Sequence, residues 1–92
     1  MIRSLKCKYT EALSRGKRVR RFVNIADVAR RKLRQLEIAN RLEDLRVPPG
    51  NHLEALTGNR SGKYSIRIND QWRVCFGWTD AGAENVEIVD YH

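Results

Sequence analysis

The chain has 92 residues and a formal charge of +7, with 41% hydrophobic and 32% charged residues. This length suits one domain, and the hydrophobic content is too high for a disordered tail. No apolar run approaches the roughly 20 residues that a membrane helix needs, and no apolar segment of a secretion signal follows the charged N-terminus. We therefore expect one domain over residues 1–92 that works in the cytoplasm without contacting a membrane.

The positive charge is concentrated in the first half of the chain. Residues 1–46 hold 14 Lys and Arg against 5 Asp and Glu, whereas residues 47–92 hold 4 against 6. Such a surface attracts polyanions, so nucleic acid is a candidate partner, and an acidic protein is an alternative.

The two cysteines lie far apart, outside any Cys/His cluster. Without a secretion signal we expect Cys7 and Cys75 to be reduced thiols, with Cys75 buried in a strand. We expect no metal ion and no other cofactor, because zinc-ligand spacing is absent from the sequence.

The first half is predicted to be mainly helical. A short strand at residues 2–5 and a short helix at residues 10–14 precede a basic loop at residues 17–21. A longer helix is expected to begin at Asn24, which can cap it together with Asp27 at the N3 position. Its inward stripe recurs at helical spacing and consists of Ile25, Val28, Ala29, Leu33 and Leu36. A second short helix is expected at residues 41–45, before a turn at residues 48–51.

The second half is predicted to be rich in strands. Strands are expected at residues 53–56, 64–68, 72–78 and 86–92, and turns or loops at residues 58–62, 69–70 and 80–82. Trp72, Val74, Phe76 and Trp78 alternate and should share one face. Short turns between consecutive strands imply an antiparallel meander. The expected fold class is therefore α+β, with a twisted, mainly antiparallel sheet and helices packed on one face.

Three polar side chains end the chain directly after an apolar strand. Val86, Ile88, Asp90 and His92 would share one face of that strand. His92 suits general acid–base work because imidazole titrates near neutral pH, and Asp90 could orient its ring. Tyr91 could stack on a base or donate a hydrogen bond, or it could simply pack against the opposite sheet face.

Arg60, Arg67 and Arg73 are the arginines that follow Arg46. Arg73 alternates out of phase with the tryptophan stripe, and antiparallel pairing could bring it close to Arg67. Guanidinium groups near a histidine and a carboxylate are typical of a site that handles phosphate. Glu54 could transfer a second proton or pair with an arginine, and His52 is expected to be exposed. Phosphate loops, GxSxG and HExxH are absent from the sequence.

Several segments together resemble HigB-type toxins of the RelE superfamily of bacterial toxin–antitoxin systems. The resemblance is carried mainly by residues 47–51, 53–56, 58–60 and 64–76 and by the ending 86–92, and also by residues 18–22, 29–33 and 42–46. The most specific parts are residues 64–76 and the terminal Asp90-Tyr91-His92. It implies a RelE-like α+β fold and a toxin that cuts mRNA in the ribosomal A site. It also implies a HigA-type helix-turn-helix antitoxin as partner, with operator DNA bound only through the antitoxin complex.

The family's site residues transfer only in part. Asp90, Tyr91 and His92 match the C-terminal motif, and Arg60 and Arg73 match basic positions. This chain departs from the common pattern at four positions. Relatives often carry arginine in place of His52 and histidine in place of Glu54. They often carry lysine in place of Thr57 and aspartate in place of Asn59. The resemblance therefore leaves open which residue acts as the general base.

The resulting hypothesis is a metal-free endoribonuclease. His92, Asp90, Tyr91, Arg73, Arg60 and Glu54 are the candidate catalytic residues. Candidate contacts to RNA or the ribosome are Lys17, Arg18, Arg20, Arg21, Arg30, Arg31, Arg34, Arg67 and Tyr64. A module of the same fold that binds RNA or the ribosome without catalysis is the main alternative. A domain that binds only an acidic protein is the third.

Overall fold

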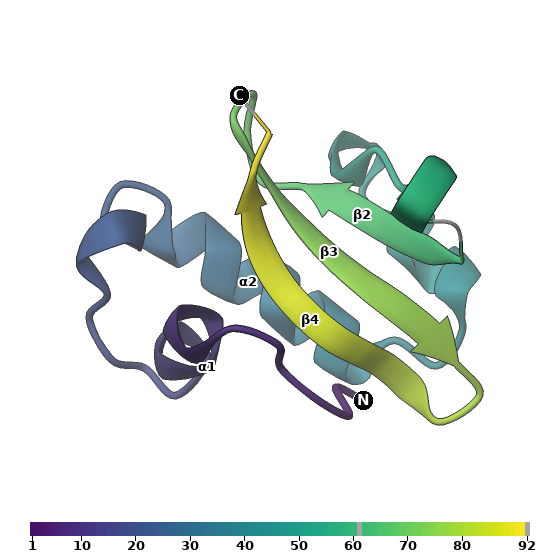
Figure 1. Cartoon of the computed structure of the whole chain (residues 1–92), viewed down its shortest axis with the longest axis horizontal. Coiled ribbons are helices and arrows are strands. Elements are labelled where there is room, and N and C mark those ends of the chain that lie inside the picture. Colours follow the sequence, from purple (N-terminus) through teal and green to yellow (C-terminus); the bar gives the residue numbers. More distant parts are fainter. Residues whose placement is uncertain (61, 92) are drawn as a thin grey trace.

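The second half of the chain folds into one antiparallel sheet (Figure 1). A computed structural model describes residues 1–60 and 62–91, without the side chain of Arg60. The strands β1 (Glu54–Ala55), β2 (Lys63–Arg67), β3 (Trp72–Thr79) and β4 (Gly82–Asp90) lie in the order β1-β2-β3-β4. Each neighbouring pair is antiparallel, which confirms the predicted meander.

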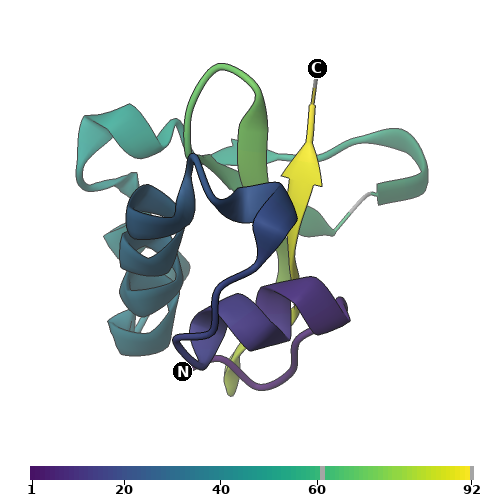
Figure 2. The ribbon, with the colours of Figure 1, turned by 90° about the vertical axis from the view of Figure 1, so that its left-hand side faces the viewer.

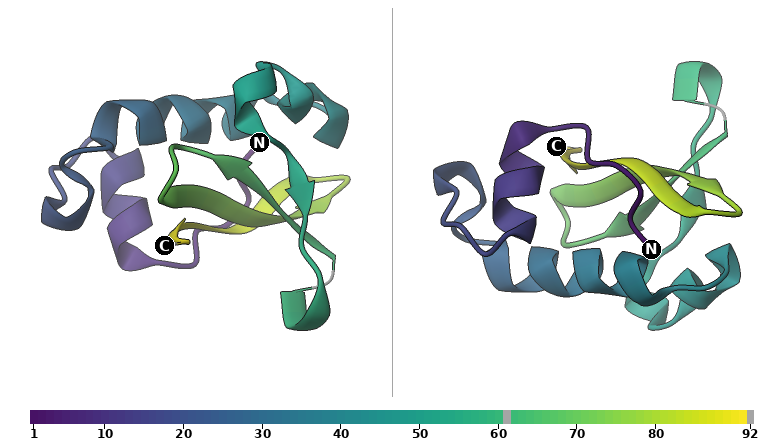
Figure 3. Two further views of the ribbon diagram at one scale, coloured as in Figure 1. Left: turned by 90° about the horizontal axis from the view of Figure 1, so that it is seen from above. Right: turned by 90° about the horizontal axis from the view of Figure 1, so that it is seen from below.

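The helices come mainly from the first half. The α-helices are α1 (Lys8–Ser14) and α2 (Ala26–Ile38), and the short 3-10 helices are η1 (Arg20–Phe22), η2 (Leu42–Arg46), η3 (Pro49–Asn51) and η4 (Gly58–Arg60). Figure 3 shows α2 along one side of the sheet and η4 beyond the other side. The molecule is therefore an α+β domain, as predicted from the sequence.

The core lies between α2 and the sheet face that carries the predicted aromatic stripe. Ala29, Leu33 and Leu36 of α2 are buried, and so are Val74 and Phe76 of β3. Trp72 meets Phe22 of η1 edge to face, with ring centroids 5.5 Å apart. Because one face of β3 is committed to this core, the alternate residues of β3 must point to the opposite face of the sheet.

α2 begins differently from the prediction. Its N-cap residue is Ile25, whose side chain makes no capping hydrogen bond, so the expected capping box of Asn24 and Asp27 is wrong. The chain instead enters α2 through a turn after η1, in which the Ile25 N–H donates to the Phe22 carbonyl at 3.0 Å. Burial of Ile25 fixes this entry, since only 6% of the residue is exposed.

The expected strand at residues 2–5 is reduced to two isolated parallel bridges. Ile2 pairs with Ala83 and Leu5 pairs with Val86 on the outer edge of β4. Between the bridges Asn85 has a positive φ of 51°, and its N–H donates to the Ser4 hydroxyl at 2.8 Å. This left-handed residue interrupts the ladder, so the N-terminal segment covers the edge of β4 without forming a regular strand.

Two strand boundaries also differ. β1 has only two residues, and β4 begins at Gly82 rather than at residue 86. The residues that open β4 lack apolar alternation, which hid them from the sequence analysis. Figure 2 shows β4 passing α1, and the Thr10 hydroxyl of α1 accepts a hydrogen bond from the Ile88 N–H of β4 at 3.1 Å. In the part of the chain that the structure describes, no helix combines the length and apolar character that crossing a membrane requires.

Candidate active site on the sheet face opposite to α2

Arg73 occupies the sheet face that points away from α2. Its side chain is 12% exposed. Its Nε donates to the Ser65 hydroxyl at 2.9 Å, and one terminal nitrogen donates to the His52 carbonyl at 2.6 Å. These contacts hold the planar guanidinium group in one orientation.

A carboxylate lies beside this guanidinium group. Glu54 of β1 pairs with Ser65 of β2, so both residues share the face of Arg73. A Glu54 carboxylate oxygen lies 3.8 Å from the second terminal nitrogen of Arg73. The ion pair to an arginine that the sequence allowed for Glu54 is therefore present. Since the Glu54 side chain is 59% exposed, its carboxylate is also open to solvent and to a bound ligand.

Tyr91 lies on the same face. The centre of its ring is 5.9 Å from the guanidinium carbon of Arg73, and Tyr91 is 43% exposed. The buried Cys75 thiol lies 4.0 Å from the Tyr91 hydroxyl. The Tyr91 N–H donates to the Gln71 carbonyl at 2.6 Å, which ties the backbone after β4 to the turn before β3.

This arrangement is suited to binding an anion next to an aromatic ring. A guanidinium group carries five N–H donors, and the bonds to Ser65 and His52 use two of them. The remaining donors can contact a phosphate oxygen beside Glu54 and Tyr91. Among the described residues, no three His, Cys, Asp or Glu side chains gather where they could hold a metal ion.

Asp90 is not part of the Arg73 cluster, which consists of Arg73 and the residues that contact it: Ser65, His52, Glu54 and Tyr91. It pairs with Trp72 in the sheet, which places it on the face of the core, opposite to that of Arg73. Its carboxylate accepts a hydrogen bond from the Gln71 side chain at 3.0 Å. His92 and the Arg60 side chain lie outside the described residues, so their predicted roles stay predictions. Asp90 remains a candidate for orienting the His92 ring.

Two further predicted contact residues, Arg67 and Tyr64, lie on opposite faces of the sheet. Arg67 is directly opposite Arg73, as antiparallel pairing predicted, but its guanidinium group forms an ion pair with Asp70 in the turn before β3. Tyr64 packs against Phe76 with ring centroids 6.2 Å apart, on the core side of the sheet. Tyr64 therefore lies on the face opposite to Arg73, and its predicted contact to RNA or the ribosome stays a prediction.

The predicted basic residues are spread over the first half of the chain. Lys17, Arg18, Arg20 and Arg21 are exposed in the segment between α1 and α2, and Arg31 and Arg34 are exposed on α2. Arg30 is half-buried and donates to the carbonyls of Leu13 and Lys17 at 3.3 and 3.1 Å. Its first role is therefore to hold the end of α1 and the following loop against α2.

A buried side chain, missed by the sequence analysis, supports the loop that binds Arg73. Asn51 is fully buried, and its amide nitrogen donates to Gln35 at 2.9 Å and to the Leu45 carbonyl at 3.0 Å. Lys32 donates to the Asn51 amide oxygen at 2.6 Å. Burial, helped by the charge of Arg31, lowers the pKa of Lys32. Asn51 thus links α2 to His52, whose carbonyl holds Arg73.

Ser65 was also missed, although the sequence contained a signal for it. In the strand 64–68, Ser65 and Arg67 alternate in phase, which marks a polar face. His52 is exposed, as predicted, but the functional group that matters is its backbone carbonyl. A carbonyl in a non-helical loop has no side-chain signature, so the sequence could not indicate this contact.

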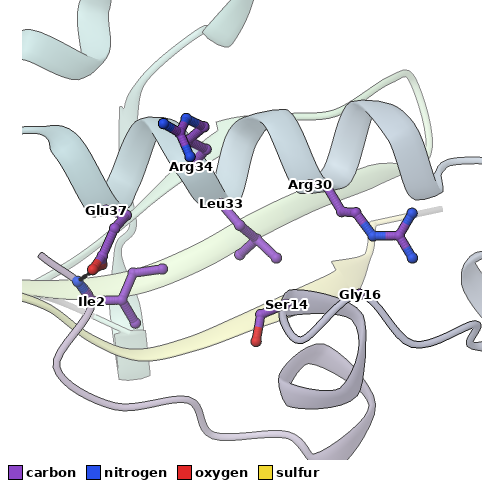
Figure 4. A pocket seen from close by; sticks show the side chains of 7 residues that line it. All are labelled: Ile2, Ser14, Gly16, Arg30, Leu33, Arg34 and Glu37. Atoms are coloured by element: carbon purple, nitrogen blue, oxygen red, sulfur yellow. Dashed lines mark hydrogen bonds between the residues drawn. The ribbon is translucent and has the colours of Figure 1, made fainter.

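A separate cavity lies between α1, α2 and the N-terminal segment (Figure 4). Its volume is about 460 Å³, and its lining includes Ile2, Leu33 and Arg30. The Ile2 N–H donates to the Glu37 carboxylate at 2.6 Å, which fixes the N-terminal segment to α2. Arg73 does not line this cavity, so it is distinct from the candidate active site.

Comparisons with known proteins identify a family that the chain matches. Residues 5–92 match the family described as "RelE-like toxin of type II toxin-antitoxin system HigB". The chain is 51% identical over 55 residues to "Toxin HigB-1" of Vibrio cholerae serotype O1, across 60% of this chain and 58% of that protein. It is 36% identical over 63 residues to an uncharacterized protein of Haemophilus influenzae, across 68% of this chain and 62% of that protein.

These alignments span about three fifths of the length of the two relatives, whereas the family match covers nearly the whole chain described above. The matched range contains α1, α2, all four strands and every residue of the Arg73 cluster. This chain therefore belongs to the family of RelE-like toxins of HigB type II toxin–antitoxin systems.

Proposed function

We propose that this chain is an endoribonuclease toxin that cleaves mRNA on the ribosome and thereby inhibits translation and growth. The observation that carries the proposal is the held guanidinium group of Arg73, flanked by the exposed residues Glu54 and Tyr91 on the sheet face opposite to α2, in a family member. A ribosomal substrate places the site of action in the cytoplasm.

The proposed reaction is a metal-free transesterification. The ribose 2′-oxygen forms a bond to the adjacent phosphorus while the bond from phosphorus to the 5′-oxygen breaks. The products are a 2′,3′-cyclic phosphate and a 5′-hydroxyl. One group must accept the 2′-hydroxyl proton and another must protonate the leaving oxygen. We assign these proton transfers to His92 and Glu54. Asp90, at the end of β4 and on the face opposite to Glu54, would orient the His92 ring past the end of the strand.

Arg73 would stabilise the charge that grows on the phosphate oxygens, and Arg60 would assist it. Tyr91 would contact the nucleotide with its ring or hydroxyl. Acid–base help is typically worth about 10²–10⁴ in rate, so positioning by the ribosome must supply much of the remainder. Cutting of free RNA is therefore expected to be weak.

The proposed neutralising partner is a HigA-type antitoxin with a helix-turn-helix domain. Operator DNA would be bound only by the complex, through that domain. The test is co-expression of the toxin with the product of a neighbouring small reading frame. Growth should recover, and the two chains should purify together. Failure of every neighbouring frame to restore growth would contradict this part of the proposal.

The test of the activity uses purified translating ribosomes and a defined mRNA. Arg73→Ala should lower the cleavage rate by about 100-fold, the scale measured when one donor to a developing oxyanion is removed. Arg41→Ala, at an exposed arginine that pairs with Glu43 outside the Arg73 cluster, should leave the rate unchanged. Cleavage that persists at the original rate in Arg73→Ala and His92→Gln would reject the site.

A non-catalytic ribosome-binding module is the second candidate, and the ion pair between Glu54 and Arg73 favours it. A carboxylate already paired with the guanidinium group reduces the positive charge available to phosphate. This candidate predicts growth arrest with intact transcripts. Mapping of mRNA 5′ ends after induction separates it from the nuclease.

A further inference from the structure

An exposed aromatic ring with cations around it lies at the start of α1, on an element held by the fold. Tyr9 is 40% exposed and lines a hollow of about 550 Å³ with Val19, Arg20 and Arg21. The next residue, Thr10, is buried and bonded to β4. The ring is therefore carried by a packed helix rather than by a loose loop.

Two cations lie within contact distance of this ring. The guanidinium carbon of Arg21 is 4.8 Å from the ring centroid, and the Lys8 ammonium is 5.3 Å from it. Such contacts are attractive because the face of an aromatic ring is electron-rich. They also concentrate positive charge around the exposed Tyr9 ring. Arg20 lines the same hollow, and none of the four lining residues is acidic.

The chemistry of this hollow fits a nucleotide. Its volume lies within the range of about 300–1,000 Å³ that is usual for small-molecule sites. Sites for single-stranded RNA combine aromatic rings or guanidinium planes, on which bases stack, with cations that contact the phosphates. Tyr9 supplies the aromatic ring, Arg21 supplies the guanidinium plane and Arg20 supplies a cation for a phosphate.

We propose that Tyr9, Arg20 and Arg21 form a binding site for one unpaired ribonucleotide. The base lies against the Tyr9 ring or the Arg21 guanidinium plane, and the flanking phosphates lie at Arg20 and Lys8. This inference rests on the proposed function and deepens it, because it assigns part of the RNA contact to a base rather than to phosphates alone. The site is separate from the Arg73 cluster and contributes to binding, not to the chemical step.

The test measures binding of fluorescent 2′-O-methyl oligoadenylate, which lacks the nucleophile for cleavage, by fluorescence anisotropy. An abasic oligomer of the same length and charge serves as the second probe. Tyr9→Ala should weaken oligoadenylate binding by roughly 5–100-fold, the range for loss of one stacked base, and leave abasic binding unchanged. Tyr9→Phe should bind as the unmodified chain does, and so should Val23→Ala, an exposed apolar control.

Several outcomes would overturn the site. One is that Tyr9→Ala binds oligoadenylate as the unmodified chain does. Another is that Tyr9→Ala loses the same affinity for the oligoadenylate and for the abasic oligomer. A third is that the unmodified chain binds polyglutamate more tightly than either oligomer. Unfolding midpoints in urea check that each variant folds. Ribosomal cleavage by Arg73→Ala separates the two proposals. If Tyr9→Ala binds oligoadenylate normally while Arg73→Ala loses cleavage, only the nucleotide site is rejected. If Tyr9→Ala binds oligoadenylate weakly while Arg73→Ala cleaves at the original rate, only the nuclease is rejected.

Discussion

Arg73 depends on a residue that never touches it. Its guanidinium group is held partly by the His52 carbonyl, and His52 follows Asn51, whose side chain is fixed by α2 and by the Leu45 carbonyl. His52 has a positive φ of 45°, a conformation that few non-glycine residues adopt without support. Asn51 therefore acts as a positioning residue for the candidate site.

Replacing Asn51 with alanine should destabilise the fold and disturb the site. The change leaves the Lys32 ammonium and the Leu45 carbonyl without their partner in a half-buried environment. Each such group costs about 1–3 kcal/mol, so we expect a loss of about 3 kcal/mol in the free energy of unfolding. Urea denaturation measures this quantity.

Asn24→Ala is the matched control. Asn24 is exposed and makes no capping bond to α2, so its replacement should change stability by less than about 0.5 kcal/mol. A loss of 1 kcal/mol or more at Asn24, or about 0.5 kcal/mol or less at Asn51, would contradict this view of the loop.

At the scale of elements, a side-chain hydrogen bond helps to attach α1 to the sheet. Thr10 and Ile88 are both buried, and the Thr10 hydroxyl accepts the Ile88 N–H. Thr10→Val keeps the shape but leaves that N–H without an acceptor. We expect a loss of about 1–3 kcal/mol in stability and faster hydrogen exchange at the Ile88 amide. Thr57→Val, at an exposed position, should change neither, and an unchanged Ile88 exchange rate would refute the prediction.

The start of α1 also affects Cys7. Burial raises the pKa of the Cys7 thiol, but the Thr10 and Tyr9 backbone groups, the Thr10 hydroxyl and the charge of Arg21 outweigh it, so the pKa is lowered. Because the thiolate is the nucleophile, alkylation of Cys7 by iodoacetamide should reach half its maximal rate at a lower pH in the folded chain than in the urea-unfolded chain.

Arg21→Gln should move this midpoint upward, because it removes a positive charge that favours the thiolate. Cys75 is 3% exposed and serves as the control within the same chain, since it should stay unmodified while the fold is intact. An equal rate at both cysteines would show that the reaction reports unfolding rather than the environment of Cys7.

Sequence patterns predicted those elements whose residues face the core. The stripe from Ile25 to Leu36 and the alternation of Trp72 to Trp78 are imposed by burial, so their periods are visible in the sequence. The start of β4 depends on a contact between distant segments, that of Ser4 with Asn85, and the turn into α2 is closed by the backbone groups of Phe22 and Ile25. Local composition does not encode such contacts.

The candidate site was predictable to a similar degree. The phase of Arg73 relative to Trp72 placed its side chain on the outer face, and pairing with β2 placed Arg67 opposite. The same rule applied to Tyr64 would have placed that ring on the core side with Phe76. The supports from Asn51 and the His52 carbonyl required the path of the loop, which no periodic pattern describes.

For the whole molecule, the positions of the cationic groups relative to the sheet decide which shape of partner can contact them. Arg31 and Arg34 extend from α2, on one side of the sheet, whereas Arg73 lies on the other side. The segment from Lys17 to Arg21 joins α1 to α2 and adds a third exposed group of cations. A flat partner could touch only one of these surfaces at a time. RNA that surrounds the domain, as in a ribosomal cleft, could touch all of them.

This distribution predicts a salt-dependent affinity that can be assigned to particular residues. Each phosphate contact on single-stranded RNA contributes about 0.7 to the slope of log K against log salt concentration. Lys17→Gln combined with Arg18→Gln should therefore reduce the slope by about 1.4, measured by anisotropy across a salt series. Arg41→Gln should leave the slope unchanged, because Glu43 lies 3.7 Å from Arg41 and already balances its charge. If Arg41→Gln reduced the slope as much as the double variant did, net charge alone would drive binding, and the exposed segment between α1 and α2 would have no special part in it.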